Sequence, residues 1–232
     1  MQLSIALPCF NEEQNIERTV SDVMQWFERE KIDGEIIVVD DGSMDGTAKV
    51  LARMATRMPQ LKIVTHEKNK GYGSAVRSGC DAATKEFMGY MDSDGQFRTE
   101  DFGQLLQFLP EYDFVTGKRT KRADSVIRWL NARLYRLLVL VALGVWVTDL
   151  NCAMKVWRRS LWPKIRPIYS TGALINGEIF YRLHRNNIPW KEVSVRHFPR
   201  LFGKQTGANI WVILKMFRDL FALKKAVLRE GN

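Results

Sequence analysis

The segment FMGYMDSDGQF, residues Phe87–Phe97, ends an apolar run in two aspartates one residue apart, Asp92 and Asp94, with Gln96 close behind. Two carboxylates at this spacing repel each other unless a positive charge lies between them. Carboxylate oxygens suit Mg²⁺ or Mn²⁺, and these ions commonly join protein carboxylates to a substrate diphosphate. A D-x-D pair alone is usually an ordinary solvated turn, but its place at the end of a strand-like run favours a metal–diphosphate site.

Other sites built from alternating acids and glycines fail on spacing. Counted from Asp92, an EF-hand calcium loop would need a glutamate at Gly103, and counted from Asp41 it would need one at Ala52. The GYGSAV segment has Val76 where a dinucleotide fingerprint needs its third glycine, and it does not open the first β-α unit. Calcium and NAD chemistry are therefore poorly supported.

The first half of the chain alternates strand-like and helix-like patterns. Four apolar residues between Ile16 and Phe27 repeat at helical spacing, which predicts a helix over residues 12–31. We expect Asn11 to cap this helix, with Gln14 as its capping-box partner. The order β-α-β-α predicts a doubly wound α/β fold, with a mostly parallel sheet and helices on both faces.

The strands must bring the polar clusters together. The expected strands of the first half are LSIALPC, EIIVVDD, LKIVTHE and EFMGYMD. Three of them run into polar clusters, which are PCFNEE, DDGSMDGT and DSDGQ. Because ligands bind at the carboxyl ends of strands in such sheets, we expect these clusters to converge on one crevice.

The second half has a looser pattern and a different charge. Its expected strands are YDFVTGK, CAMKVW and WKEVSV, with helices over residues 125–144 and ALINGEIFYRLHR. Residues 1–114 hold 12 Lys/Arg against 20 Asp/Glu, whereas residues 115–232 hold 23 against 6. Such a split indicates that the halves meet different partners. Nucleic-acid binding would explain the basic half, but it gives no account of the strand-end acids.

We expect one main domain over residues 1–207 and an amphipathic helix over residues 208–232, since no repeat or linker divides the chain. The uncharged stretch Leu137–Thr148 is too short for a bilayer span, which needs about 20 residues. It is either a buried helix or an interfacial one. The chain opens directly on a strand-like run, so we expect no signal peptide. Three scattered cysteines suit a reducing compartment.

Four motifs, PCFNEEQNI, VVDDGSMDGT, NKGYGSA and MDSDGQF, stand in the order and rough spacing of family-two inverting glycosyltransferases with the GT-A fold. Within that family the chain most resembles polyprenyl-phosphate sugar synthases such as dolichyl-phosphate mannose synthase. The second half is similar to the acceptor side of that subgroup, though less strictly. The resemblance implies metal-dependent inverting transfer of a sugar from a GDP- or UDP-sugar to a dolichyl or undecaprenyl phosphate.

The resemblance also implies roles on the donor side. The residues that would hold the nucleotide are Pro8, Phe10, Glu12, Asp40 or Asp41, Gly71 and Asp92. Asp94 and Gln96 would be ligands of Mg²⁺ or Mn²⁺, with Asp92 beside them orienting the sugar nucleotide. The family often has tyrosine where Phe10 stands. A turn or capping role is the open alternative for Asp40 and Asp41.

On the acceptor side the resemblance points to arginines. A lipid phosphate must approach an anionic diphosphate, so bidentate cations are needed to bind it. Arg119, Arg128 and Arg200 stand at positions similar to the family's phosphate-binding arginines. The family's further arginine is Phe202 here, which leaves the assignment open between Arg200 and Lys204.

A hydroxyl acceptor would need a general base, whereas a phosphate is already ionised near neutral pH. Asp149 and Glu178 are the candidate bases, and a buried ion pair is the equally open alternative for each. We expect a peripheral enzyme on the cytoplasmic face of the membrane, with a membrane-anchored partner or a homo-oligomer as further expectations. The alternatives are a saccharide or protein hydroxyl acceptor, a nucleic-acid-binding protein and an inactive nucleotide-sugar sensor.

Overall fold

The structure is a computed structural model that describes residues 1–120, 126–200, 202–203 and 218–225, and within these it leaves the side chains of 126–132 and 134 undescribed. The described residues form seven strands in one sheet, in the order β3-β2-β1-β4-β6-β5-β7. Their bounds are β1 Gln2–Cys9, β2 Asp33–Asp40, β3 Leu61–Thr65, β4 Phe87–Tyr90, β5 Phe114–Arg119, β6 Lys155–Arg158 and β7 Trp190–Val195.

The sheet is mostly parallel, as predicted. Strand β1 pairs in parallel with β2 and β4, and β5 pairs in parallel with β7, whereas β6 runs antiparallel to both of its neighbours. The β1 strand is mostly apolar and is buried from Leu3 to Cys9, as expected of a strand covered on both faces. β6 inserts between β4 and β5 and thereby joins the two halves of the chain in one sheet.

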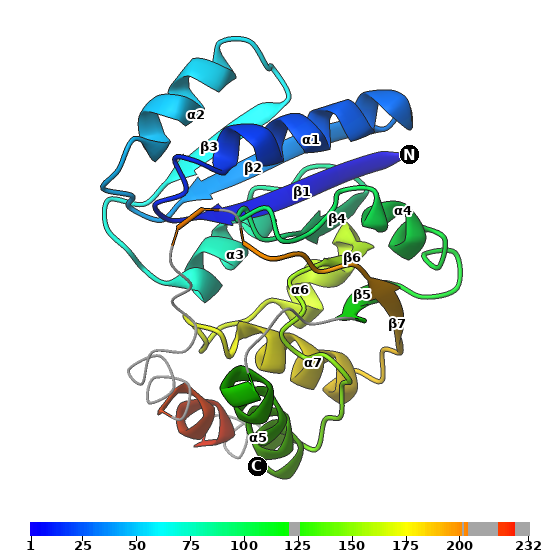
Figure 1. Cartoon of the computed structure of the whole chain (residues 1–232). Helices are drawn as coiled ribbons and strands as arrows, with labels where there is room; N and C mark the ends of the chain where they lie inside the picture. Colours follow the sequence, from blue (N-terminus) through cyan, green and yellow to red (C-terminus); the bar gives the residue numbers. More distant parts are fainter. Residues whose placement is uncertain (121–125, 201, 204–217, 226–232) are drawn as a thin grey trace.

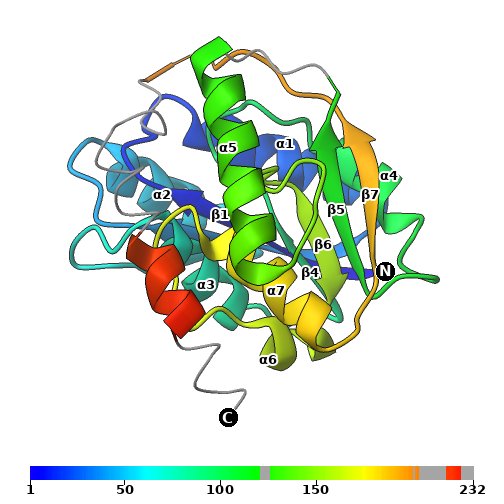
Figure 2. The same ribbon diagram turned by 90° about the horizontal axis from the view of Figure 1, so that it is seen from below.

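Helices cover both faces of the sheet. Their bounds are α1 Ile16–Arg29, α2 Thr47–Ala55, α3 Tyr72–Asp81, α4 Asp101–Leu106, α5 Val126–Leu143, α6 Trp162–Ile165 and α7 Ile175–Arg185. Figures 1 and 2 show α1 and α2 on one face, and α3, α7 and α5 on the other. The predicted arrangement of a mostly parallel sheet between two layers of helices is confirmed.

The predicted cap of α1 is wrong. The helix begins at Ile16, and its first residue follows a turn in which the Glu12 carbonyl accepts the backbone N–H groups of Asn15 and Ile16. Asn11 adopts a left-handed backbone (φ 55°), and its Oδ1 accepts the Met44 N–H at 2.8 Å. Asn11 therefore joins the loop after β1 to the loop after β2 instead of capping a helix.

The two helices predicted before the C-terminal one, over residues 125–144 and ALINGEIFYRLHR, are present as α5 and α7. α5 differs from the predicted 125–144 by one residue at each end. Within the predicted C-terminal helix, the structure describes residues 218–225, which are helical, with Leu220 and Leu223 buried and Phe221 exposed. The division of the chain into residues 1–207 and 208–232 stays a prediction.

Candidate active site

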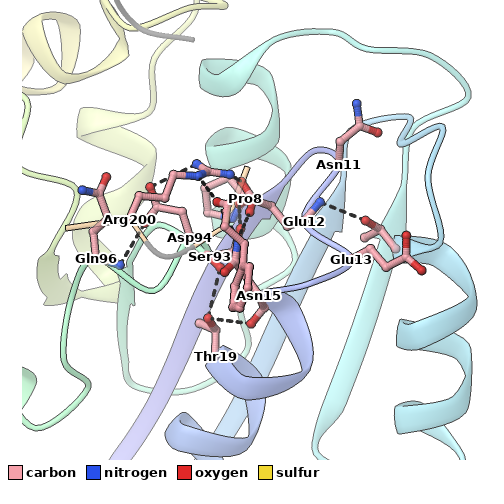
Figure 3. Close-up of polar contacts among 12 residues, drawn as sticks. Pro8, Asn11, Glu12, Glu13, Asn15, Thr19, Ser93, Asp94, Gln96 and Arg200 are labelled. Atoms are coloured by element: carbon pink, nitrogen blue, oxygen red, sulfur yellow. Dashed lines mark hydrogen bonds and ion pairs between the residues drawn. The ribbon is translucent and has the colours of Figure 1, made fainter. Parts of the chain in front are cut away.

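The loops after β1, β2 and β4 meet at one edge of the sheet. These strands are parallel neighbours, so their carboxyl ends open on the same side. The Asn11 N–H donates to Ser43 Oγ at 2.9 Å, which joins the first two loops. Figure 3 shows Glu12, from the first loop, close to Asp94, from the third. The three polar clusters converge, as their positions in the sequence predicted.

The D-x-D turn is held from both sides. The Ser93 hydroxyl, between the two aspartates, donates to the Pro8 carbonyl at 2.7 Å and ties the turn to β1. The backbone N–H of Gln96 donates to Asp94 Oδ1 at 3.1 Å. Asp92 is partly buried, and its Oδ1 is fully buried without a hydrogen-bond partner among the described residues. The turn therefore presents a pre-positioned pair of carboxylates.

Burial raises the pKa of both aspartates despite the cations near them. The pKa of Asp92 is raised, first by burial and then by the nearby charge of Asp94, while a hydrogen bond from Tyr72 opposes the shift. Burial also raises the pKa of Asp94, against the Gln96 N–H and the charge of Arg200. A divalent cation between the two carboxylates would favour the ionised form of both.

The oxygen donors of this turn fit a hard divalent metal. The Gln96 side chain donates its Nε2–H to the Phe198 carbonyl at 2.9 Å, so its Oε1 is the end left to accept or ligate. In the part of the chain that the structure describes, no three His, Cys, Asp or Glu side chains gather as a metal cluster. A metal held here would therefore use Asp94, Gln96 and Asp92 together with substrate oxygens, a donor set typical of Mg²⁺ or Mn²⁺.

Arg200 joins two candidate donor-side acids. Its Nη2 lies 2.6 Å from Glu12 Oε1, and its Nη1 lies 3.3 Å from Asp94 Oδ2 (Figure 3). Its Nε donates to the Phe202 carbonyl at 2.5 Å, which fixes the guanidinium plane. Arg200 was predicted to hold an acceptor phosphate; its observed partners are on the donor side. For Asp94 to bind a metal through this oxygen, Arg200 must release it.

The residues predicted to hold the base and ribose surround the end of β1. Pro8 is buried in the strand, whereas Phe10 is 39% exposed and available to a flat ligand. Glu12 is buried, and its Oε2 accepts Asn15 Nδ2 at 2.7 Å. Burial raises the pKa of Glu12, against hydrogen bonds from Asn15 and Arg200. Both oxygens of Glu12 are paired within the protein, so a ribose hydroxyl would have to replace one of these partners.

Asp40 and Asp41 differ in how many of their carboxylate oxygens already accept hydrogen bonds within the protein. Asp40 Oδ1 accepts the Ser43 N–H at 2.9 Å, which is the turn role kept open for it. Asp41 Oδ1 accepts the Lys70 N–H at 2.9 Å, and its Oδ2 accepts the Gly71 N–H at 2.8 Å. Gly71 has a left-handed backbone (φ 97°), which favours glycine at this position. Asp41 organises the loop before α3, so Asp40 is the better candidate for direct contact with a base.

A basic cavity of about 430 Å³ lies between β5, α5 and the segment before β6. Among the described residues that line it are four cations and one acid, namely Lys118, Arg119, Arg133, Arg136 and Asp149. Arg119, which lines this cavity, is near enough to the acidic turn for its charge to lower the pKa of both Asp92 and Asp94. The cavity is therefore a candidate anion site next to the D-x-D turn.

The two candidate bases are engaged in ion pairs. Asp149 makes a bidentate pair with Arg119, with both N–O distances 2.7 Å, and it also accepts the Arg119 backbone N–H at 3.0 Å. Glu178 is fully buried and accepts the N–H groups of Ile168 and Ser170, at 2.7 and 2.8 Å, in addition to pairing with Arg182. The geometry supports the ion-pair alternative for both acids.

Two polar residues near Asp92 were not predicted. Tyr72 is near enough to Asp92 for the two groups to shift each other's pKa, and its place inside GYGSA was the available signal. Lys155 on β6 is fully buried; its ammonium donates to the Cys152 carbonyl and lies 5.4 Å from the centroid of the Tyr90 ring. Burial lowers the pKa of Lys155 to about 8. The side chains of Arg128 and Lys204 lie outside the described residues.

Comparison with known proteins decides the family. Residues 4–183 match Glycosyl transferase family 2. The chain is a family-2 glycosyltransferase. It is similar to the undecaprenyl-phosphate 4-deoxy-4-formamido-L-arabinose transferase of Photorhabdus laumondii, with 27% identity over 237 residues, covering 98% of this chain and 70% of the relative. It is also 27% identical over 173 residues to a dolichyl-phosphate beta-glucosyltransferase of Trichomonas vaginalis, covering 67% of this chain and 51% of the relative.

Solved structures share the fold of this glycosyltransferase. The glucosyl-3-phosphoglycerate synthase of Mycobacterium tuberculosis, in complex with Mn²⁺, UDP and glucosyl-3-phosphoglycerate, superposes with a TM-score of 0.70 at 21% identity, covering 95% of this chain and 79% of that one. The mannosyl-3-phosphoglycerate synthase of Rubrobacter xylanophilus has a TM-score of 0.74 at 18% identity, covering 100% and 75%. The predicted family and fold are confirmed.

Proposed function

We propose that this glycosyltransferase moves a sugar from a nucleotide-diphosphate sugar to a polyprenyl phosphate. The observation that carries the proposal is the adjacency of an acidic strand-end turn and a basic cavity, coupled through Arg119. A nucleotide diphosphate with its metal suits the first, and an anionic acceptor suits the second. The relatives named above transfer sugars to undecaprenyl or dolichyl phosphate, which supports this choice of acceptor.

The proposed reaction is one in-line displacement. An acceptor phosphate oxygen forms a bond to the anomeric carbon while the bond from that carbon to the diphosphate breaks on the opposite face. The electron pair of the breaking bond leaves with the nucleoside diphosphate, and the anomeric configuration inverts. Lys118, Arg133 and Arg136 would hold the acceptor phosphate in the cavity, where their charge offsets its repulsion from the diphosphate.

The donor is held by the chain itself around the strand ends. Asp94, Gln96 and Asp92 would ligate Mg²⁺ or Mn²⁺, and the bound ion would neutralise the departing diphosphate. Asp40 would contact the base and Glu12 the ribose, each from a buried position at the end of its strand. Solved structures with this fold contain UDP with Mn²⁺ or Mg²⁺, which supports a donor of this class.

A phosphate acceptor suits the observed acids better than a hydroxyl acceptor does. A hydroxyl must lose its proton to a base, whereas a phosphate is ionised near neutral pH. Asp149 already holds Arg119 through both oxygens, and Glu178 is fully buried. Neither carboxylate is presented to an acceptor, so we favour an acceptor that needs no base.

We also propose that α5 meets the membrane surface on its cytoplasmic face. Val141 is 74% exposed, Leu137 and Trp146 are about half exposed, and the Arg136 guanidinium lies 4.4 Å from the centroid of the Trp146 ring. Apolar side chains beside cations are typical of interfacial helices. None of the helices in the described part of the chain has the length and apolarity that a bilayer crossing requires. In this proposal residues 1–207 are the catalytic domain and 208–232 a second contact.

The function is tested by sugar transfer into an organic phase. The purified protein is incubated with Mn²⁺ or Mg²⁺, a panel of radiolabelled UDP- and GDP-sugars and undecaprenyl or dolichyl phosphate. We expect label in the lipid extract with at least one donor, and none without metal. A parallel reaction with saccharide and peptide hydroxyl acceptors separates the alternative. Label in those acceptors and none in the lipid would overturn the proposal.

A further inference from the structure

His66 lies between the two loops that flank the proposed nucleotide-base site. It follows β3 and is buried, with Nδ1 2.6 Å from Asp41 Oδ1 and Nε2 3.0 Å from Ser78 Oγ. Because a carboxylate only accepts hydrogen bonds, Nδ1 donates to Asp41. The ring therefore links the end of β2 to the middle of α3.

Asp41, the partner of His66, closes the loop before α3. It accepts the N–H groups of Lys70 and Gly71 together with the His66 ring, and it is only 2% exposed. The same two loops are in close backbone contact, because a Cβ added to Gly42 would lie 2.6 Å from the carbonyl carbon of Lys68. The loop of residues 68–71 can thus take its position only against an ordered loop at residues 41–43.

We propose that His66 is a positioning residue for the donor nucleotide. It orients Asp41, Asp41 fixes the backbone of residues 70–71, and the two loops together form the wall against which the base packs. His66 itself touches neither the nucleotide nor the reacting atoms. This inference rests on the proposed use of the strand-end site by a nucleotide diphosphate, and it adds a residue that the family motifs do not include.

Isosteric substitutions separate the two hydrogen bonds of the ring. In His66→Asn the amide nitrogen can take the place of Nδ1 and keep the bond to Asp41. In His66→Gln the longer side chain reaches the place of Nε2, towards Ser78, and leaves Asp41 without this donor. His66→Ala removes both bonds. His184→Ala, at an exposed position on α7, is the matched control.

The primary readout is calorimetric binding of UDP and of GDP with Mn²⁺, which needs neither acceptor nor turnover. We expect Kd for the nucleotide that binds to rise about tenfold in His66→Ala and His66→Gln, the loss of one charge-assisted hydrogen bond. His66→Asn and His184→Ala should bind within twofold of the parent protein. In transfer assays KM for the donor should rise with kcat and KM for the lipid unchanged.

Two results would overturn the inference. One is unchanged nucleotide binding in a folded His66→Ala variant. The other is an equal loss of nucleotide affinity in His66→Asn and His66→Gln, because an effect of lost packing alone would be the same in both variants. Thermal unfolding of each variant shows that it is folded at the assay temperature. If the parent protein binds neither UDP nor GDP, the proposed function and this inference fail together. If it binds one but does not glycosylate lipid, only the acceptor is wrong.

Discussion

Arg200 and Asp94 lie 3.3 Å apart, and this contact ties a segment near the end of the chain to the D-x-D turn. The same guanidinium pairs with Glu12, 188 positions away in sequence. The Arg200 guanidinium therefore contacts the Asp94 oxygen that the proposed metal ion would need as a ligand. Metal binding and the Arg200–Asp94 pair should compete, and this competition can be measured.

Arg200→Ala should lower the thermal midpoint of the protein alone by about 4 °C, because the buried Glu12 and the partly buried Asp94 lose their counter-ion. Mn²⁺–UDP should raise the thermal midpoint of this variant by more than it raises that of the parent protein, since no arginine has to be displaced from Asp94. Differential scanning fluorimetry with and without Mn²⁺–UDP measures both effects. Arg196→Ala, which breaks the ion pair with Asp101, is the control and should leave the Mn²⁺–UDP increment unchanged. Equal increments in all three proteins would contradict the competition.

Asp94→Asn and Gln96→Ala should each reduce kcat/KM for sugar transfer by about a hundredfold or more, because the departing diphosphate loses its charge stabilisation. The nucleotide should also lose the part of its affinity that depends on Mn²⁺, which calorimetry with and without the ion reports. Asp22→Asn, on the exposed surface of α1, should behave like the parent protein. Undiminished transfer by both variants would remove these residues from the metal site.

Sequence alone predicted the strands of the first half and the meeting of their polar loops, because that information is local. Continuous apolar runs gave the buried strands, and the polar clusters directly after them gave the edge at which Asp94 and Glu12 meet. The chain order of the motifs gave the family. The wrong prediction that Asn11 caps α1 has the same origin. A cap pattern considers only residues close in sequence, whereas the side chain of Asn11 accepts a hydrogen bond from Met44 in another loop.

The acceptor half depends on contacts that no local pattern encodes. The antiparallel insertion of β6 and the burial of Lys155 follow from pairing with distant strands. Glu178 could not be assigned from sequence, because a carboxylate that accepts backbone N–H groups and one that accepts a substrate proton are the same residue type. Arg200 was predicted as a functional residue, but its donor-side partners depend on how residues after β7 fold back.

Lys118→Gln and Arg133→Gln should raise KM for the polyprenyl phosphate by about tenfold each, because a charge-assisted bond to the acceptor phosphate is worth 1.5–3 kcal/mol. Both side chains line the basic cavity, so KM for the donor should stay within twofold. Initial rates with each substrate varied in turn make the distinction. Lys164→Gln, at an exposed cation in α6, controls for the change in net charge. A rise in KM for the donor alone would mean that the cavity binds the nucleotide sugar and not the polyprenyl phosphate.

A double variant with Leu137→Ser and Val141→Ser should bind anionic vesicles about tenfold more weakly, because exposed apolar side chains of α5 no longer enter the interface. Sedimentation with phosphatidylglycerol vesicles measures the partition. Nucleotide binding should be unchanged, since neither Leu137 nor Val141 belongs to the strand-end loops or is among the residues that line the basic cavity. Ile63→Thr, a partly exposed apolar residue on the edge strand β3, is the control. Full vesicle binding by the double variant would place the membrane contact elsewhere.

Glu35 predicts how stability depends on pH. It is buried in β2, and burial by itself raises its pKa, but hydrogen bonds from Lys62, Ser4 and Thr84 outweigh this and bring the pKa to about 2 from 4.5. The Lys62 ammonium lies 2.6 Å from its Oε2. Because the folded pKa is lower than the unfolded one, ionised Glu35 stabilises the protein above pH 4.5, and this stabilisation is lost as pH falls towards 2.

Glu35→Gln should therefore lower the free energy of unfolding at pH 7 by about 2 kcal/mol and flatten its decline between about pH 4.5 and 2. Urea unfolding at several pH values across this window compares the slopes directly. Glu111→Gln, at an exposed site, should keep the slope of the parent protein. An equally steep decline in Glu35→Gln would mean that other carboxyls, such as Asp33 or Asp81, whose pKa values are also lowered, dominate acid unfolding.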